Sequence, residues 1–196
     1  MGSDIKNLVD KLAETMREMV RKTELSKTFG ETDPGQLIVM ELTMYAMYLS
    51  ASDGEVSEVE AKQMAENFGF ELTPAQIGQF IRQQNIYSTD FEKKVPVSMQ
   101  IFVAIDNAMH EQGLDTNLEK MSSQILYETF EAIGNTIILS DGVEDAQEKE
   151  DSAIYLKMLK RFMDENLVAQ KDPAKGFKKK GSISSDRMMD ILDKME

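Results

Sequence analysis

The chain has 196 residues, 41% of them apolar, so it is long enough to bury a sizeable hydrophobic core as one domain with tails. It contains no cysteine and one histidine, which excludes disulfides, thiolate metal sites and histidine-rich metal sites. The net charge of −13 is uneven, because residues 166–196 carry seven Lys/Arg and five Asp/Glu and leave −15 on residues 1–165. A body this acidic favours cations or basic partners and disfavours nucleic acid.

No apolar run approaches the ~18 residues that a membrane-spanning helix needs. The N-terminus also lacks the charged-then-apolar layout of a signal peptide. We therefore expect a cytoplasmic protein without a membrane span.

The first predicted helix covers residues 4–28, where apolar side chains recur at spacings of three and four. Gly30 and the Asp-Pro-Gly sequence at 33–35 then break the chain. The second predicted helix, roughly 35–52, is apolar on nearly every face, and Glu41 is its only charged residue. Such a helix belongs in the middle of a bundle.

A glycine turn and a capping box connect the second helix to the third. Gly54 follows the second helix, at a position where a glycine with positive φ often ends a helix. Ser57 and Glu60 have the spacing of a capping box, in which each side chain bonds the other residue's backbone amide. They predict a third helix over about 57–69.

Thr73, followed by proline and by Gln76, predicts a fourth helix that runs to about residue 84. After a polar stretch, residues 96–109 again show helical spacing. The β-branched run at 95–103 is also compatible with a strand, but no partner strand lies anywhere near it in the sequence. We therefore predict a helix there.

Thr116 and Glu119 form a further capping box and predict a long helix to about Ser140. Gly134 inside this helix costs about 1 kcal/mol relative to alanine. We expect this glycine to permit close approach of a neighbouring helix.

Asp145 and Glu148 open the last long helix, which we expect to run to about Leu167. The basic segment 171–181 is interrupted by proline and glycine, so we interpret it as a linker with little structure. Residues 184–195 could form a short terminal helix that orders on packing or binding.

The sequence thus predicts an all-α fold: a bundle of about seven helices made of two similar halves, with an extra N-terminal helix and a flexible C-terminal tail. We divide the chain into an N-terminal helix (1–30), an all-helical domain (35–167) and a basic tail (168–196). The halves of the domain are about 35–84 and 95–167.

A short acidic pattern occurs twice, and its copies stand 88 residues apart. We call residues 53–60 the first joint and residues 141–148 the second joint. Each begins with Asp-Gly, at Asp53 and Asp141, has a capping residue four positions after the Asp, and ends in Glu60 or Glu148. Each lies between an apolar helix and an amphipathic one. This agreement indicates an internal duplication.

The residues of the joints have two interpretations. Helix capping accounts for Glu60, Glu148 and the glycines. Asp53 and Asp141 fit capping less well, because a carboxylate at a helix C-terminus meets exposed carbonyl groups. An Asx turn, a Lys or Arg, or a metal ion could compensate. Oxygen ligands of this kind suit a hard cation such as Ca²⁺ or Mg²⁺, and a Ca²⁺ site would need both joints to converge or water to complete it.

The repeated sequence of apolar helix, Ser-Asp-Gly-Glu-Val-Ser-x2-Glu and amphipathic helix resembles the TerB-like family of tellurite-resistance-associated domains. The resemblance covers about residues 35–167, and Val143 replaces the acidic residue in the second copy. It implies an all-helical domain of two halves whose acidic positions gather into a negatively charged, metal-binding patch. The ligands carried over are Asp53, Glu60, Asp141 and Glu148.

These features lead us to expect a non-enzymatic interaction or stress-response module with an acidic patch that holds a divalent cation. Its expected partners are proteins, basic or membrane-associated, with homo-oligomers also open. The alternative is a structural assembly protein whose terminal segments dock onto neighbouring copies. An enzyme with two carboxylates as acid and base ranks third, because the sequence has no nucleophile motif or phosphate-binding loop.

Overall fold

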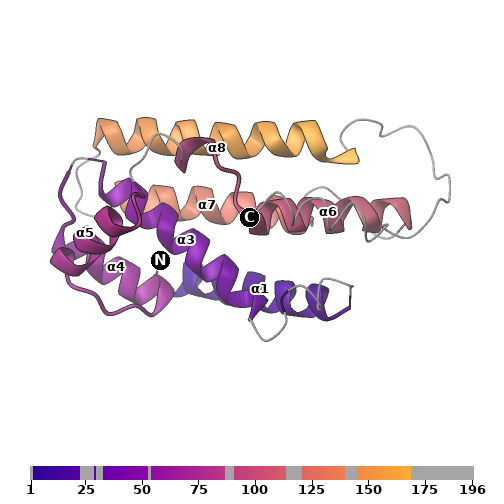
Figure 1. Ribbon diagram of the computed structural model, residues 1–196, viewed down its shortest axis with the longest axis horizontal. Coiled ribbons are helices and arrows are strands. Elements are labelled where there is room, and N and C mark those ends of the chain that lie inside the picture. Colours follow the sequence, from indigo (N-terminus) through magenta and orange to yellow (C-terminus); the bar gives the residue numbers. More distant parts are fainter. Residues whose placement is uncertain are drawn as a thin grey trace.

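Segments whose apolar side chains recur every three or four residues form the α-helices of the protein. The computed structural model describes residues 2–22, 29, 33–52, 54–86, 91–113, 121–139 and 145–168. Its helices are α1 (Gly2–Arg21), α3 (Pro34–Ser50), α4 (Glu58–Phe68), α5 (Pro74–Gln83), α6 (Val97–Glu111), α7 (Ser122–Ile138) and α8 (Ala146–Asn166), and the 3₁₀ turn η1 (Phe91–Lys93) precedes α6. These residues contain no strand, so the predicted all-α bundle is confirmed (Figure 1).

The two halves of the bundle repeat each other with an offset of 88 residues. Helices α3 and α7 both have 17 residues and begin at 34 and 122, and α4 and α8 begin at 58 and 146. In the first half α1 packs on both α3 and α4, as α6 packs on both α7 and α8 in the second. Helices α3 and α7 contact each other across the halves, and α5 packs on α3 and α4.

The N-terminal helix is an integral part of the first half. Ala13 is buried, and five larger apolar side chains of this helix belong to the common core: Ile5, Val9, Leu12, Met16 and Val20. Near its end, the Arg17 guanidinium donates two hydrogen bonds of 2.8 Å to Asp33, the N-cap residue of α3. In the second half, Asp106 of α6 accepts a hydrogen bond from the Ser122 amide at the start of α7. Asp106 and Ser122 are 16 residues apart, the same separation as Arg17 and Asp33. Helix α1 therefore corresponds to α6.

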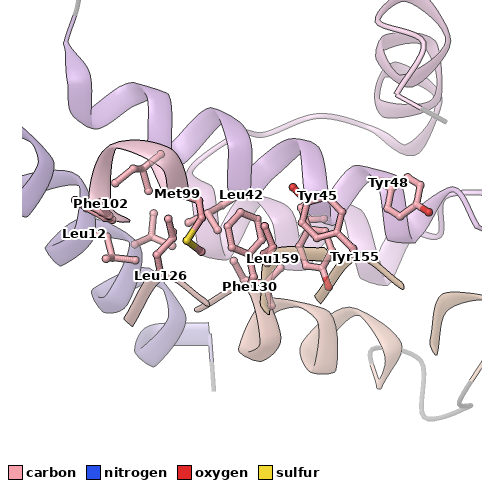
Figure 2. Packing of buried hydrophobic residues seen from close by; sticks show 14 of the residues in the cluster. Leu12, Leu42, Tyr45, Tyr48, Met99, Phe102, Leu126, Phe130, Tyr155 and Leu159 are labelled. Carbon is pink, nitrogen blue, oxygen red and sulfur yellow. The ribbon is translucent and has the colours of Figure 1, made fainter. Parts of the chain in front are cut away.

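An aromatic cluster joins the halves at the middle of the core. The Tyr45 ring of α3 stacks on Tyr155 of α8 with 4.7 Å between ring centroids and meets Phe130 of α7 edge-on at 5.2 Å. The hydroxyl groups of Tyr45 and Ser152 lie 2.9 Å apart in a buried hydrogen bond. Figure 2 shows this cluster continuing into the aliphatic side chains between α1, α3, α6 and α7.

Gly134 lies where three helices meet, which confirms the predicted close approach. A Cβ atom at this position would stand 2.8 Å from the Ser152 hydroxyl and 2.8 Å from the Tyr45 hydroxyl. Real Cβ atoms essentially never come this close to another atom. The missing side chain of Gly134 therefore allows the hydrogen bond between Tyr45 and Ser152 to cross the face of α7.

The start of α7 differs from the prediction, whereas the helix predicted over 96–109 is confirmed as α6. The sequence predicted that a capping box at Thr116 and Glu119 opens the helix. Met121 has an extended backbone, with φ −64° and ψ 140°, so α7 begins only at Ser122. The predicted start is therefore wrong, and the two residues of the predicted box lie outside the described residues.

Three further predictions fall outside the described residues: the end of the first helix at 23–28, the linker at 171–181 and the terminal helix at 184–195. In the part of the chain that the structure describes, no helix is both long enough and apolar enough to cross a membrane.

Candidate functional site at the helix joints

The first joint contains the capping box that its sequence predicts. Ser57 is the N-cap of α4, and its hydroxyl accepts a hydrogen bond of 3.2 Å from the Glu60 amide. The Glu60 carboxylate completes the capping box, because its Oε2 accepts a hydrogen bond of 2.7 Å from the Ser57 amide. Gly54 has a φ of +93°, which confirms the predicted left-handed turn. Asp53, the first residue of the joint, lies outside the described residues.

Glu60 has a second oxygen that capping does not explain. Its side chain is only 5% exposed, and its Oε1 is buried without a hydrogen-bond partner. A buried carboxylate oxygen without a donor lowers the stability of the fold, because it has lost its hydrogen bonds to water and no protein donor replaces them. Such an atom is able to accept a hydrogen bond or to ligate a cation.

The second joint caps α8 in a different way. Asp145 is the N-cap residue, and its Oδ1 accepts from the amides of Gln147 at 2.7 Å and Glu148 at 3.1 Å. Glu148 itself is buried, with 7% of its side chain exposed. The first four residues of this joint, including Asp141, lie outside the described residues.

A hydrogen bond between the halves brings the end of α3 to the first turns of α8. The Ser52 hydroxyl, one residue before the first joint, donates to Asp151 Oδ2 at 2.7 Å. The other oxygen of Asp151 accepts from the Gln147 side chain at 2.9 Å. Asp151 is one helical turn after Glu148, so the two side chains share a face of α8. We call this end of the bundle, at the left in Figure 1, the joint end.

The structure therefore describes two of the four predicted metal ligands. Glu60 and Glu148 are buried acids near the N-termini of α4 and α8, and Asp53 and Asp141 lie outside the described residues. Within the described ranges, no three or more acidic or histidine side chains are grouped so that they could hold a metal ion. The unpartnered oxygen of Glu60 nevertheless fits the chemistry of a hard-cation ligand.

Half-buried Glu41 and buried Asp106, which the sequence did not single out as site residues, cap helices from a distance. Glu41 of α3 accepts from the amides of Val97 at 2.6 Å and Ser98 at 3.0 Å, at the start of α6. The Ser98 hydroxyl also donates to this carboxylate. Burial raises the pKa of Glu41, although these hydrogen bonds and the charge of Lys94 oppose the shift.

Asp106 of α6 has the same role at the start of α7. Its Oδ1 accepts from the Ser122 amide at 3.1 Å, and its Oδ2 accepts from the Ser123 amide at 2.9 Å and hydroxyl at 2.6 Å. Asp106 is 4% exposed, and burial raises its pKa against these hydrogen bonds. The signal that could have identified both residues is a lone acid inside an apolar helix.

Comparison of the chain with family models, with curated proteins and with solved structures found no match. Both oxygens of Glu41 and of Asp106 bond amides at the start of a helix, and each oxygen of Asp151 has a side-chain donor. Glu60 differs, because one of its oxygens caps a helix and the other is unpartnered.

Proposed function

We propose that this chain is a non-enzymatic interaction module of the stress-response type, and that its joint end binds a divalent cation, Ca²⁺ or Mg²⁺. The observation that carries the proposal is Glu60 Oε1, a buried carboxylate oxygen without a partner, in the joint whose sequence begins with Asp-Gly. Hard cations take carboxylate and carbonyl oxygens as ligands. The cation would be held by Asp53, Glu60, Asp141 and Glu148.

Two further observations support placing the cation at the joint end. The hydrogen bond from Ser52 to Asp151 links the end of α3 to the helix that carries Glu148, so residues from both halves meet there. The net charge of −15 over residues 1–165 also raises the local concentration of cations around the body. A bound cation would offset the repulsion between neighbouring carboxylates and leave an ordered surface for a protein partner.

Titration calorimetry of the full chain with CaCl₂ and with MgCl₂ tests the proposal. We expect a saturable isotherm with one of the two salts and a higher melting temperature in its presence. Glu60→Gln should weaken binding about 10- to 100-fold while keeping an oxygen that can cap α4, and Asp53→Asn with Asp141→Asn should do the same.

Glu66→Gln is the matched control, because Glu66 is an exposed acid on the same helix that forms an exposed ion pair with Lys62. It removes the same charge and should leave the affinity unchanged. No heat with either salt, or equal weakening by Glu66→Gln and Glu60→Gln, would contradict the cation site. If light scattering then showed that the full chain self-associates and a chain of residues 1–168 does not, a structural assembly role would replace the proposed cation-binding role.

A further inference from the structure

Helix α4 turns a polar flank toward the protein interior. Three of its side-chain oxygens are buried without a hydrogen-bond partner: Glu60 Oε1, Gln63 Oε1 and Asn67 Oδ1. Residues spaced by three and four lie on one side of a helix, so Glu60, Gln63 and Asn67 form one continuous surface, the polar flank of α4. Glu60 and Asn67 are 5% and 3% exposed, which means that water does not replace the missing donors. Each oxygen therefore makes the packed position of α4 less favourable.

The second half provides an internal comparison for this polar flank. The residues 88 positions later, on α8, are Glu148, Asp151 and Tyr155. Asp151 receives donors from Ser52 and Gln147, one to each oxygen. Tyr155 stacks in the aromatic cluster of the core. The same flank is thus hydrogen-bonded and apolar on α8, whereas on α4 it holds unpaired acceptors.

Apolar packing does little to compensate on α4. Only two of its apolar side chains are buried, Ala61 and Met64, and Phe68 is partly buried. Helix α8 instead buries three large side chains, Tyr155, Leu159 and Met163. Because hydrophobic stabilisation grows with the apolar area removed from water, the 11-residue α4 as a whole gains less from burial than the 21-residue α8.

A left-handed glycine lies on each side of α4. Gly54 has a φ of +93° before the helix and Gly69 has a φ of +78° as its C-cap. Glycine moves between positive and negative φ without the steric cost that other residues have. Hinges commonly lie at such element-terminal positions, where a few residues absorb a large backbone change. Both ends of α4 can therefore pivot without strain.

We propose that α4 is a displaceable helix, which detaches from α1, α3 and α5 as a unit between Gly54 and Gly69 while the rest of the bundle stays folded. Detachment exposes the oxygens of Glu60, Gln63 and Asn67 to water, and it loses the apolar contacts of Ala61, Met64 and the partly buried Phe68. This conformational device does not depend on the proposed cation, so its test is run with EDTA present.

Native-state hydrogen exchange of the full chain tests the proposal. The amides of residues 62–68 should exchange about 100-fold faster than those of residues 45–49 in α3 and 130–134 in α7. They should also exchange together, with one dependence on denaturant, as expected for a unit that opens cooperatively. Protection of α4 equal to that of α3 would overturn the proposal.

Variants of the polar flank separate detachment from the fraying of any short helix. Gln63→Met combined with Asn67→Leu removes two unpaired acceptors, so the exchange of α4 should slow about tenfold. Lys62→Met is the control, because Lys62 is an exposed residue of the same helix and its replacement should leave the exchange rate of α4 unchanged. Unchanged exchange in the double variant would contradict the role of the polar flank.

Discussion

At the scale of single residues, the helix caps divide into two kinds. Ser57, Thr73 and Asp145 cap from the next few positions of the chain, and the sequence predicts them because the whole motif spans four residues. Helices α6 and α7 follow Pro96 and Met121, which have no capping side chain, and distant acids bond their first amides instead. Such caps are not predictable from local sequence, because they depend on how the helices pack.

Asp106→Ala should destabilise the protein by about 2–4 kcal/mol, because it leaves the part-buried amide of Ser122 and the buried amide and hydroxyl of Ser123 without their acceptor. Urea unfolding followed by circular dichroism measures the change. Glu128→Ala removes an exposed acid from α7 and should cost no more than about 0.5 kcal/mol. Equal effects of the two substitutions would argue against capping by Asp106.

The pH dependence of stability tests the environment of Glu41. Burial raises its pKa in the folded chain above the ordinary value of 4.5, so folding takes up a proton between these two values. The stability that Glu41 contributes relative to Glu41→Gln should be greatest below the ordinary pKa and should fall as the pH rises through the raised pKa. Urea unfolding of both proteins between pH 4 and pH 7 measures this difference. A difference that grows with pH would show that the hydrogen bonds outweigh burial.

At the scale of the helices, the sequence predicts that Gly134 permits a close approach but does not identify the neighbours. Its apolar surroundings indicate a buried helix, yet only the assembled bundle places Tyr45 and Ser152 against it. The start of α7 was predicted wrongly for a related reason. The first turn of α7 is bonded by the distant Asp106, a tertiary contact that the local sequence does not reveal.

Gly134→Ala should destabilise the protein by about 1–3 kcal/mol, although alanine favours a helix by about 1 kcal/mol. The new methyl group would force apart the hydroxyls of Tyr45 and Ser152. Gly78→Ala in α5 is the matched control. Its Cβ would lie 3.5 Å from the Arg82 side chain, an ordinary contact, so this change should be neutral or stabilising. Thermal melting compares the two, and a stabilised Gly134→Ala protein would contradict the close approach.

At the scale of the whole molecule, the sequence predicts the duplication from the two joints but assigns α1 to a separate segment. The joints repeat a readable motif, whereas the correspondence of α1 to α6 has no motif. It shows only in packing and in the contacts of Arg17 and Asp106. The sequence likewise predicts only part of the candidate site. Local capping identifies Glu60 and Glu148, but the distant acids, and the neighbours of Glu60 on the polar flank of α4, depend on tertiary structure.

Deletion of residues 1–30 should prevent stable folding, because it removes the five larger buried side chains of α1 and exposes the apolar surfaces of α3, α4 and α7. The circular dichroism signal of the shortened chain should be weak or should melt without cooperativity. A chain of residues 1–168 keeps every described helix and should melt cooperatively. Cooperative melting of the chain without α1 would contradict its place in the core.

We propose that the two duplicated joints meet at one end of the bundle and hold one cation. A titration of the ¹⁵N-labelled full chain with CaCl₂, followed by amide NMR, tests it most directly. We predict that amides of both joints, including Gly54 and Glu148, shift together with a single dissociation constant. Amides beside the exposed acids Glu14 and Glu66 should not move. Shifts spread over exposed acids without saturation, or shifts at one joint alone, would contradict the claim.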